Sequence, residues 1–240
     1  MSVITGRDRD VLKREFRKDL KNDVTIRLFT QRPSILTIPG RDCRYCTQTQ
    51  QLMEELTSLS NKLHLEVYDF YTQTEESAKY GVERIPAIVM GQNGDSRVKF
   101  YGIPMGPEFP TIIEGIKTLS RGVSPLTMDS RKKLRKVNQR IHIQVFVTPS
   151  CGYCPALARL AHASAIENPL ITADVIEVEE FPSLAQMYGV RGVPKTVIGT
   201  ASQLTGLLPQ VQFVGAATEA EFVAKIQEAG VRSTSEESAS

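Results

Sequence analysis

The stretch Cys151-Gly152-Tyr153-Cys154 decides the fold of this chain. A strand-like run, Ile141-His142-Ile143-Gln144-Val145-Phe146-Val147, comes just before it, and residues 155–165 after it have a helical pattern. A strand that leads through a turn into two cysteines three positions apart at the start of a helix is how a redox-active dithiol is built. The stretch therefore predicts an αβ unit that carries a reactive cysteine pair.

The spacing of the two cysteines has a geometric reason. Residues three apart on a regular helix have Cβ atoms about 5–6 Å apart, whereas a disulfide requires roughly 3.5–4.5 Å. The first cysteine is therefore expected just outside the helix, where unpaired backbone N–H groups and the positive end of the helix dipole favour the thiolate. Because the thiolate is the attacking species, we predict that Cys151 is the nucleophile and that Cys154 resolves the mixed disulfide.

The chain contains the same pattern a second time, at Cys43-Arg44-Tyr45-Cys46, and the two pairs hold all four of its cysteines. In both copies a proline follows the first cysteine by 43 positions, at Pro86 and at Pro194. The predicted elements around these residues also repeat, so that each half has the order α-β-α-β-α-β-β-α. Cys43 and Cys46 are therefore predicted to form a second redox centre.

The two copies differ at two places near the cysteines. Residues 31–42 of the first half form a loop that is about nine residues longer than its counterpart. Arg44 stands where the second motif has the small residue Gly152. A nearby cation favours a thiolate, so the two centres are expected to differ in redox potential.

Composition and charge fit a globular protein with a packed core. Hydrophobic residues make up 41% and charged residues 23% of the 240 residues, and the net charge is only +2. This charge argues against a polyanionic partner, so the basic run at residues 131–136 is interpreted as the exposed face of a helix rather than as a nucleic-acid site. Residues 1–20 lack the apolar core of a signal peptide, and no apolar run is long enough to span a membrane. We therefore expect a cytoplasmic protein with reduced thiols.

The combined pattern resembles the thioredoxin/glutaredoxin superfamily. A strand, a CxxC motif, a helix and then Ile85-Pro86 or Val193-Pro194 before a later strand is the arrangement of that superfamily. Two such units in one chain, covering nearly all of residues 11–230, resemble the glutaredoxin-like protein disulfide oxidoreductases. Tyrosine at the third motif position is similar to the glutaredoxins.

The resemblance implies an α/β fold of two tandem thioredoxin-like units, each with a mixed central sheet flanked by helices, packed into one body. The N-terminal unit is expected over residues 1–122 and the C-terminal unit over residues 123–231, with a disordered tail at residues 232–240. Pro86 and Pro194 are expected to be cis and to face their own dithiols.

The same resemblance implies which residues contact a substrate. The backbone of Ile85 and Val193, with the adjoining prolines, is expected to offer hydrogen bonds to an extended client segment, a form of strand addition. Tyr45 and Tyr153 hold matched positions beside the two nucleophiles and are expected at the rim that faces the client.

Zinc binding is the strongest alternative for the cysteines. Two CxxC pairs can supply four thiolates, but zinc sites usually draw both pairs from within about 15–20 residues. Cys46 and Cys151 are 105 positions apart, and each pair opens its own αβ unit. A purely structural disulfide is disfavoured because closing a loop of four residues removes little chain entropy. No metal is therefore predicted, and a zinc-binding scaffold without enzymatic activity is the least favoured hypothesis.

The predicted function is thiol–disulfide exchange on protein disulfides, by reduction, oxidation or isomerisation, without a cofactor. The alternative is a dedicated electron-transfer module between a thioredoxin-reductase-like flavoprotein and a peroxiredoxin-type peroxidase, which uses the same chemistry. Client proteins with disulfides are the expected partners in the first case, and those two proteins in the second. Neither nucleic acid nor a membrane is an expected partner.

Overall fold

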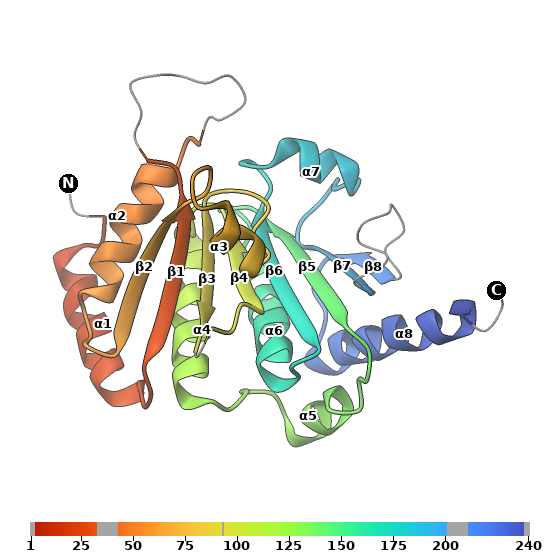
Figure 1. Cartoon of the computed structure of the whole chain (residues 1–240). Coiled ribbons are helices and arrows are strands. Elements are labelled where there is room, and N and C mark those ends of the chain that lie inside the picture. The colour runs from red at the N-terminus through yellow and green to blue at the C-terminus, as the bar shows by residue number, and fades with distance from the viewer. Residues whose placement is uncertain (1–2, 33–42, 93, 201–210, 238–240) are drawn as a thin grey trace.

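The predicted order of elements occurs twice in the computed structural model, which describes residues 3–32, 43–92, 94–200 and 211–237, with side chains to residue 230 (Figure 1). Most of the long loop at residues 31–42 lies outside the described residues. The first half contains α1 (Gly6–Asp19), β1 (Val24–Thr30), α2 (Cys46–Thr57), β2 (Leu63–Asp69), α3 (Thr74–Lys79), β3 (Ala87–Gly91), β4 (Val98–Tyr101), the short 3-10 helix η1 (Gly106–Glu108) and α4 (Phe109–Arg121). The second half contains α5 (Met128–Leu134), β5 (Ile141–Val147), α6 (Cys154–Glu167), β6 (Ile171–Glu177), α7 (Pro182–Met187), β7 (Lys195–Thr200), β8 (Val211–Val214) and α8 (Glu219–Glu237).

The strands of both halves form one sheet of eight strands, in the order β2-β1-β3-β4-β6-β5-β7-β8. The halves meet where β4 pairs in parallel with β6, from Val98 beside Ala173 to Tyr101 beside Ile176. Within each half the third and fourth strands are antiparallel, so the sheet is mixed, as predicted. The two thioredoxin-like sheets are thus joined edge to edge through backbone pairing, which confirms the prediction of two units packed into one body.

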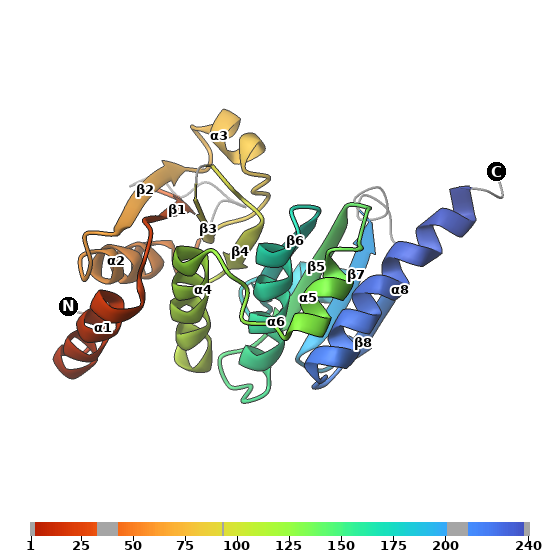
Figure 2. The same ribbon diagram turned by 90° about the horizontal axis from the view of Figure 1, so that it is seen from below.

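Helices cover both faces of this sheet. The view from below shows α1, α2, α4, α5, α6 and α8 together on one face, with α3 on the opposite side (Figure 2). The larger apolar core lies under the first set and continues through both halves, from Phe16 to Phe222. A smaller, aromatic cluster around Phe29, Tyr101 and Phe146 lies on the other face, where residues next to α3 and α7 complete it. Burial of both sheet faces is what stabilises strands of this apolar content.

The strand directions bring the sequence motifs to one end of the sheet, the end where β1 and β5 finish. β1, β4, β6 and β5 run the same way, so their carboxyl ends lie together. β3 and β7 run the opposite way and begin at that same end of the sheet. Each cysteine motif follows β1 or β5, and each proline precedes β3 or β7. The topology therefore places both motifs and both prolines at this end of the sheet.

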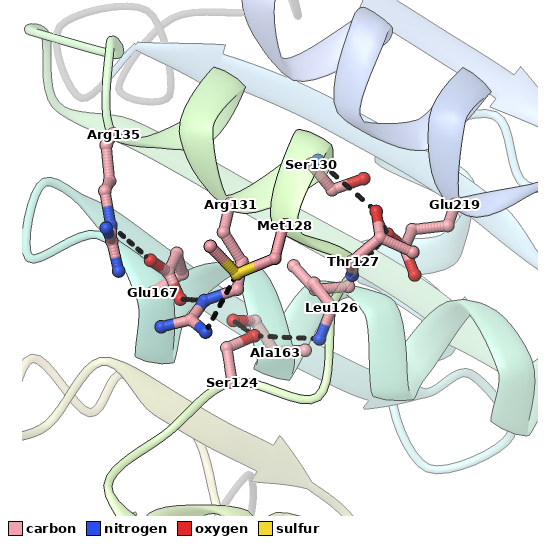
Figure 3. Close-up of polar contacts among 10 residues, drawn as sticks. All are labelled: Ser124, Leu126, Thr127, Met128, Ser130, Arg131, Arg135, Ala163, Glu167 and Glu219. Atoms are coloured by element: carbon pink, nitrogen blue, oxygen red, sulfur yellow. Dashed lines mark hydrogen bonds and ion pairs between the residues drawn. The ribbon is translucent and has the colours of Figure 1, made fainter.

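Helix α5 fastens the beginning of the second half (Figure 3). Arg131 and Arg135 each pair with Glu167 at the end of α6, at 2.7 and 2.6 Å. The hydroxyl of Thr127 donates to Glu219 at the start of α8, at 2.6 Å. Because the Glu167 side chain is only 3% exposed, these two arginines hold a buried carboxylate. Arg131 and Arg135 of the basic run at residues 131–136 are therefore structural, and its Lys132 and Lys136 are exposed, as predicted.

Helix α8 continues to Glu237, into the segment for which composition predicts disorder. Its first turns are anchored by buried Phe222, Val223 and Ile226, and each residue added to an existing helix gains one hydrogen bond. The structure therefore differs from the expectation over residues 232–237, and residues 238–240 lie outside the described residues.

Within the described part of the chain, no helix combines the length and apolar character needed to cross a membrane.

Candidate functional site

Each cysteine motif forms a disulfide at the start of a helix. Cys43 is bonded to Cys46 and Cys151 to Cys154, with 5.5 Å between the Cα atoms of each pair. Helix α2 begins at Cys46 and α6 at Cys154, so the first cysteine of each pair lies just before the helix, as the spacing predicts. Cys46 and Cys154 are buried, whereas Cys43 and Cys151 are half-buried. In both pairs the first cysteine is therefore the more exposed of the two.

A backbone N–H of the second motif contacts the sulfur of Cys151. The N–H of Cys154 donates to Sγ of Cys151 at 3.2 Å. This N–H is one of the groups that a helix start leaves without an internal partner, and the helix dipole is positive there. Pro155 follows in the first turn, where its missing N–H costs no helix hydrogen bond. The same contact is available to a thiolate once the disulfide is reduced.

Both predicted prolines follow cis peptide bonds, Ile85-Pro86 and Val193-Pro194. The carbonyl of Pro86 accepts a hydrogen bond from the N–H of Gly102 at 2.9 Å, and Pro194 accepts one from Gly215 at 2.8 Å. Ile85 also lines a cavity together with Cys43. The conformation agrees with what the resemblance implies, and the contacts of these four residues with a client stay a prediction.

The two motif tyrosines have different surroundings. Tyr153 is 73% exposed, whereas Tyr45 is half-buried and packs against the main core. The guanidinium of Arg44 lies 5.1 Å from the centre of the Tyr45 ring, and the Tyr45 carbonyl accepts hydrogen bonds from the backbone and the hydroxyl of Thr49. The rim around the second motif is therefore open, while the first motif is packed. The substrate-facing role of either tyrosine stays a prediction.

A cavity of about 290 Å³ adjoins the first disulfide, and the second half closes it. Cys43, Arg44 and Tyr45 line one side of this cavity, together with residues that adjoin β3 and β4. Its other side is lined by Pro149, Glu177, Glu179, Glu180 and Pro182. The first dithiol thus faces a wall of three carboxylates that belong to the other half of the chain.

Hydrogen bonds fix two of these carboxylates. Glu177 ends β6 and accepts the N–H groups of Glu179 and Glu180, at 3.1 and 2.9 Å. Glu180 accepts the N–H of Ile103 in the first half, at 2.6 Å. Burial raises the pKa of Glu180 to about 7; the Ile103 N–H and the Arg44 charge oppose this rise, and the Glu177 charge adds to it. Glu180 therefore changes its charge near neutral pH.

Glycine at position 102 is what allows this close contact between the halves. Gly102 has φ of +103°, and a Cβ there would lie 2.6 Å from Oε1 of Glu180 and 2.8 Å from Cβ of Glu177. Gly215 occupies the matching place in the second half with φ of +95°, yet a Cβ there would meet nothing within 4 Å. Both positions need glycine for the backbone conformation, but only Gly102 needs it for space as well.

Sequence reasoning named none of these carboxylates. The turn after β6 reads Glu177-Val178-Glu179-Glu180, and its counterpart after β2 reads Asp69-Phe70-Tyr71-Thr72. The two turns are built alike, because Asp69 accepts the N–H groups of Tyr71 and Thr72 as Glu177 accepts those of Glu179 and Glu180. A comparison of the two turns would have shown Glu180 where the first half has Thr72.

The arrangement of the cysteines differs from that of a four-thiolate metal site. Each sulfur is bonded to its own pair-mate, and the two pairs open different helices in different halves. Across the residues that the structure describes, no group of three or more His, Cys, Asp or Glu side chains is gathered in a way that could hold a metal ion.

Known proteins of similar sequence are longer than this chain. NADH dehydrogenase of Bacillus subtilis (strain 168) is 23% identical over 179 residues, which are 72% of this chain and 33% of that protein. The F subunit of alkyl hydroperoxide reductase from Staphylococcus aureus (strain NCTC 8325 / PS 47) is 25% identical over 131 residues, 54% of this chain and 24% of that protein. The chain thus spans about a third or less of the length of these relatives.

Two solved structures share the whole architecture. A protein disulfide oxidoreductase from Aeropyrum pernix K1 is 28% identical, with a TM-score of 0.78 over 93% of this chain and 92% of that one. The F subunit of alkylhydroperoxide reductase from Enterococcus faecalis (V583), solved in a mutant form, is 23% identical, also with a TM-score of 0.78, over 93% of this chain and 99% of that one. The second likeness shows the fold alone.

A known domain family matches the chain twice. The thioredoxin domain corresponds to residues 35–114 and again to residues 141–219, and each match contains one CxxC motif and one cis proline. The two matches together cover more than half of the residues and confirm the family resemblance that the motifs indicate. The chain therefore belongs to the thioredoxin domain family.

Proposed function

We propose that this chain is a thiol–disulfide oxidoreductase that acts on protein disulfides through two centres, Cys43/Cys46 and Cys151/Cys154. One observation carries the proposal: in both halves a reachable cysteine before a helix is bonded to a buried cysteine in the first turn of that helix. The units that carry these centres are taken as residues 1–122 and 123–231.

Reduction of a client at the second centre takes two exchange steps. The Cys151 thiolate attacks one sulfur of the client disulfide, and the other client sulfur leaves as a thiolate that takes a proton from water. The Cys154 thiol then gives up its proton, and its sulfur attacks Sγ of Cys151, which releases the first client sulfur. The client gains two electrons, and the Cys151–Cys154 bond forms. The reverse sequence oxidises a client dithiol.

Three features support a role for the rest of the motif. The Cys154 N–H already points at Sγ of Cys151, so it can stabilise the attacking thiolate. The segments around Ile85-Pro86 and Val193-Pro194 lie at the end of the sheet that carries the dithiols. An extended client could pair with the backbone of these segments as an added strand. Tyr153 is exposed enough to contact such a client, and Tyr45 lines the cavity beside Cys43.

The reduction of insulin disulfides, with dithiothreitol as electron donor, tests this function. Cys151→Ser and Cys43→Ser are each expected to remove the turnover of one centre, and the double variant is expected to be inactive. Cys154→Ser is expected to accumulate a mixed disulfide between Cys151 and the client, which mass spectrometry of the digested adduct detects. Full activity of the double variant would end the proposal.

A second function is favoured by the sequence relative that is named as the F subunit of alkyl hydroperoxide reductase. In it, the same two dithiols carry electrons from a flavoprotein reductase to a peroxiredoxin-type peroxidase instead of serving general clients. The discriminating measurement is NADH-dependent peroxide consumption with those two purified proteins. Peroxidase turnover without insulin reduction supports this second function, and insulin reduction without peroxidase turnover supports the first. A cytoplasmic location, where thiols are kept reduced, belongs to both proposals.

A further inference from the structure

The cavity beside Cys43 is a feature that the exchange chemistry does not by itself require. The first cysteine of the first motif lines it, and its far wall is the Glu177–Glu180 turn of the second half. The turn is held in place from both sides, by its own hydrogen bonds to Glu177 and by the Ile103 N–H that Glu180 accepts. Gly102 leaves the space that this approach needs. A carboxylate from one half is thus built into the environment of the other half's dithiol.

We propose that Glu180 of the second half is a positioning residue of the first dithiol, and that its charge sets how readily reduced Cys43 releases its proton. This inference rests on the proposed function, because it concerns the same cysteine in its reduced state. It makes the first centre a composite of both halves. The corresponding turn of the first half, Asp69 to Thr72, ends in a neutral side chain where the second half has Glu180.

Electrostatics gives the direction of the effect. A negative carboxylate in the same cavity disfavours a negative sulfur, so ionised Glu180 keeps Cys43 protonated, and neutral Glu180 releases this restraint. The charges of Glu177, from its own turn, and of Arg44, from the segment before α2, act on Glu180, and Glu179 and Cys43 line the same cavity. Because burial raises the pKa of Glu180 to about 7, the charge of this carboxyl, and with it the restraint on Cys43, changes across neutral pH.

A merely structural role is the competing explanation. Glu180 could serve only to accept the Ile103 N–H and so to fasten the two halves together. In that case its neutral amide analogue, which keeps an acceptor oxygen at the same place, would leave the ionisation of Cys43 unchanged. The two explanations therefore differ in a property of the sulfur and not in stability.

The test measures the ionisation of both cysteines in one sample. The full chain is reduced, freed of reductant and treated briefly with iodoacetamide at a series of pH values, and mass spectrometry of the digest gives the alkylation rate of Cys43 and of Cys151 separately. In the wild-type chain we expect the Cys43 rate to rise in two steps and the Cys151 rate in one. In Glu180→Gln we expect a single step at Cys43 and a rate about tenfold higher near pH 7.5, equivalent to one pKa unit.

Two matched variants control this result. Glu179→Gln removes the same charge from an exposed position on the rim of the same cavity, and we expect less than a twofold change at Cys43. Glu180→Asp keeps the charge, and we expect it to retain the two-step profile. Cys151 is expected to be unaffected in every variant, which excludes a general loosening of the fold.

Several outcomes would overturn the inference. They are a single-step Cys43 profile in the wild-type chain, an unchanged profile in Glu180→Gln, or an equal effect of Glu179→Gln. The wild-type profile needs no substitution, so the inference stays testable even if a variant does not fold. Alkylation reports protonation and not turnover, so a chain that fails to reduce insulin but shows these profiles would disprove only the proposed function.

Discussion

The two dithiol centres have the same backbone plan but different neighbours. At the second centre Gly152 and Tyr153 are exposed, and the outer strand of the adjoining hairpin is β8, whose Val214 is 59% exposed. At the first centre the corresponding outer strand is β4, and β6 of the other half pairs with it. The internal repeat therefore determines the chemistry of each centre, and the place of each unit in the common sheet determines its surroundings.

This difference explains why the wall of carboxylates forms at the first centre. The glycine after the outer strand meets Glu180 in the first half and empty space in the second. A duplicated unit that is joined through one edge must have one outer strand covered and one exposed. Asymmetry between the two centres thus follows from the way the halves are joined, even where their motifs agree.

The largest expected effect concerns the acid that faces the seam between the halves. Asp174 on β6 contacts Lys99 on β4 at 3.8 Å and His142 at 2.8 Å, and it is 3% exposed. Asp174→Ala leaves the buried Lys99 without its carboxylate and is expected to lower the free energy of unfolding by about 3–5 kcal/mol. Urea unfolding at pH 7 measures this loss.

Glu66 is the matched control, because it occupies the same register position on β2 as Asp174 does on β6. It pairs with Arg27 at 2.9 Å, but its side chain is 44% exposed, and Arg27 also lies over the ring of Tyr80. Glu66→Ala is expected to cost about 1 kcal/mol. Equal losses in the two variants would contradict the view that the covered edge and the open edge have different electrostatics.

The next effect compares the acids at two helix starts. Glu108, just before α4, is 1% exposed, and burial raises its pKa from 4.5 to about 7 against the opposing influence of Thr111 and Arg159. The folded chain therefore holds a proton that the unfolded chain releases, so this stabilisation is complete below about pH 4.5 and is lost as the pH rises through about 7. Glu108→Gln is expected to raise the free energy of unfolding at pH 8 by at most about 3 kcal/mol and to leave it unchanged near pH 4.

Glu221 at the start of α8 should behave in the opposite way. It is exposed, and its pKa is lowered by the backbone and hydroxyl hydrogen bonds of Thr218, which complete a capping box. Its contribution is present at neutral pH and is lost as the pH falls, so Glu221→Gln is expected to destabilise the chain at pH 7. Denaturant unfolding of the wild-type chain and of both variants between pH 4 and pH 8 gives the change in free energy of unfolding for each substitution as a function of pH. The two substitutions would contradict the opposite pKa shifts of Glu108 and Glu221 if both effects changed with pH in the same direction.

The smallest effect separates space from backbone conformation at the two matched glycines. Gly102→Ala and Gly215→Ala both place a side chain at positive φ and share that cost. Only Gly102→Ala also pushes against Glu180 and Glu177, so we expect it to be less stable than Gly215→Ala by about 1–3 kcal/mol. Thermal or denaturant unfolding of the pair is the measurement. The Cys43 alkylation profile should shift in Gly102→Ala alone, and equal behaviour of both variants would show that the cavity wall is not tightly packed.

Local sequence patterns were sufficient for the repeat and the two cysteine pairs, and the family resemblance supplied the cis prolines. The CxxC spacing limits where a disulfide can form. The equal sequence separations from Cys43 to Pro86 and from Cys151 to Pro194 show that the two halves repeat the same order of elements. The pairing of β4 with β6 is not contained in any such pattern, because either outer strand could have been the one that joins the halves. For that reason the contact of Glu180 with the first half and the spatial need for Gly102 became visible only in the folded chain.

The continuous sheet also sets how far apart the two disulfides lie. The dithiols follow β1 and β5, which are four strand spacings apart in the common sheet, or roughly 19 Å. Because β4 and β6 are bonded directly, no hinge between the halves can bring one sulfur pair onto the other. The pairing that joins the two halves therefore also holds the two sulfur pairs of one chain apart.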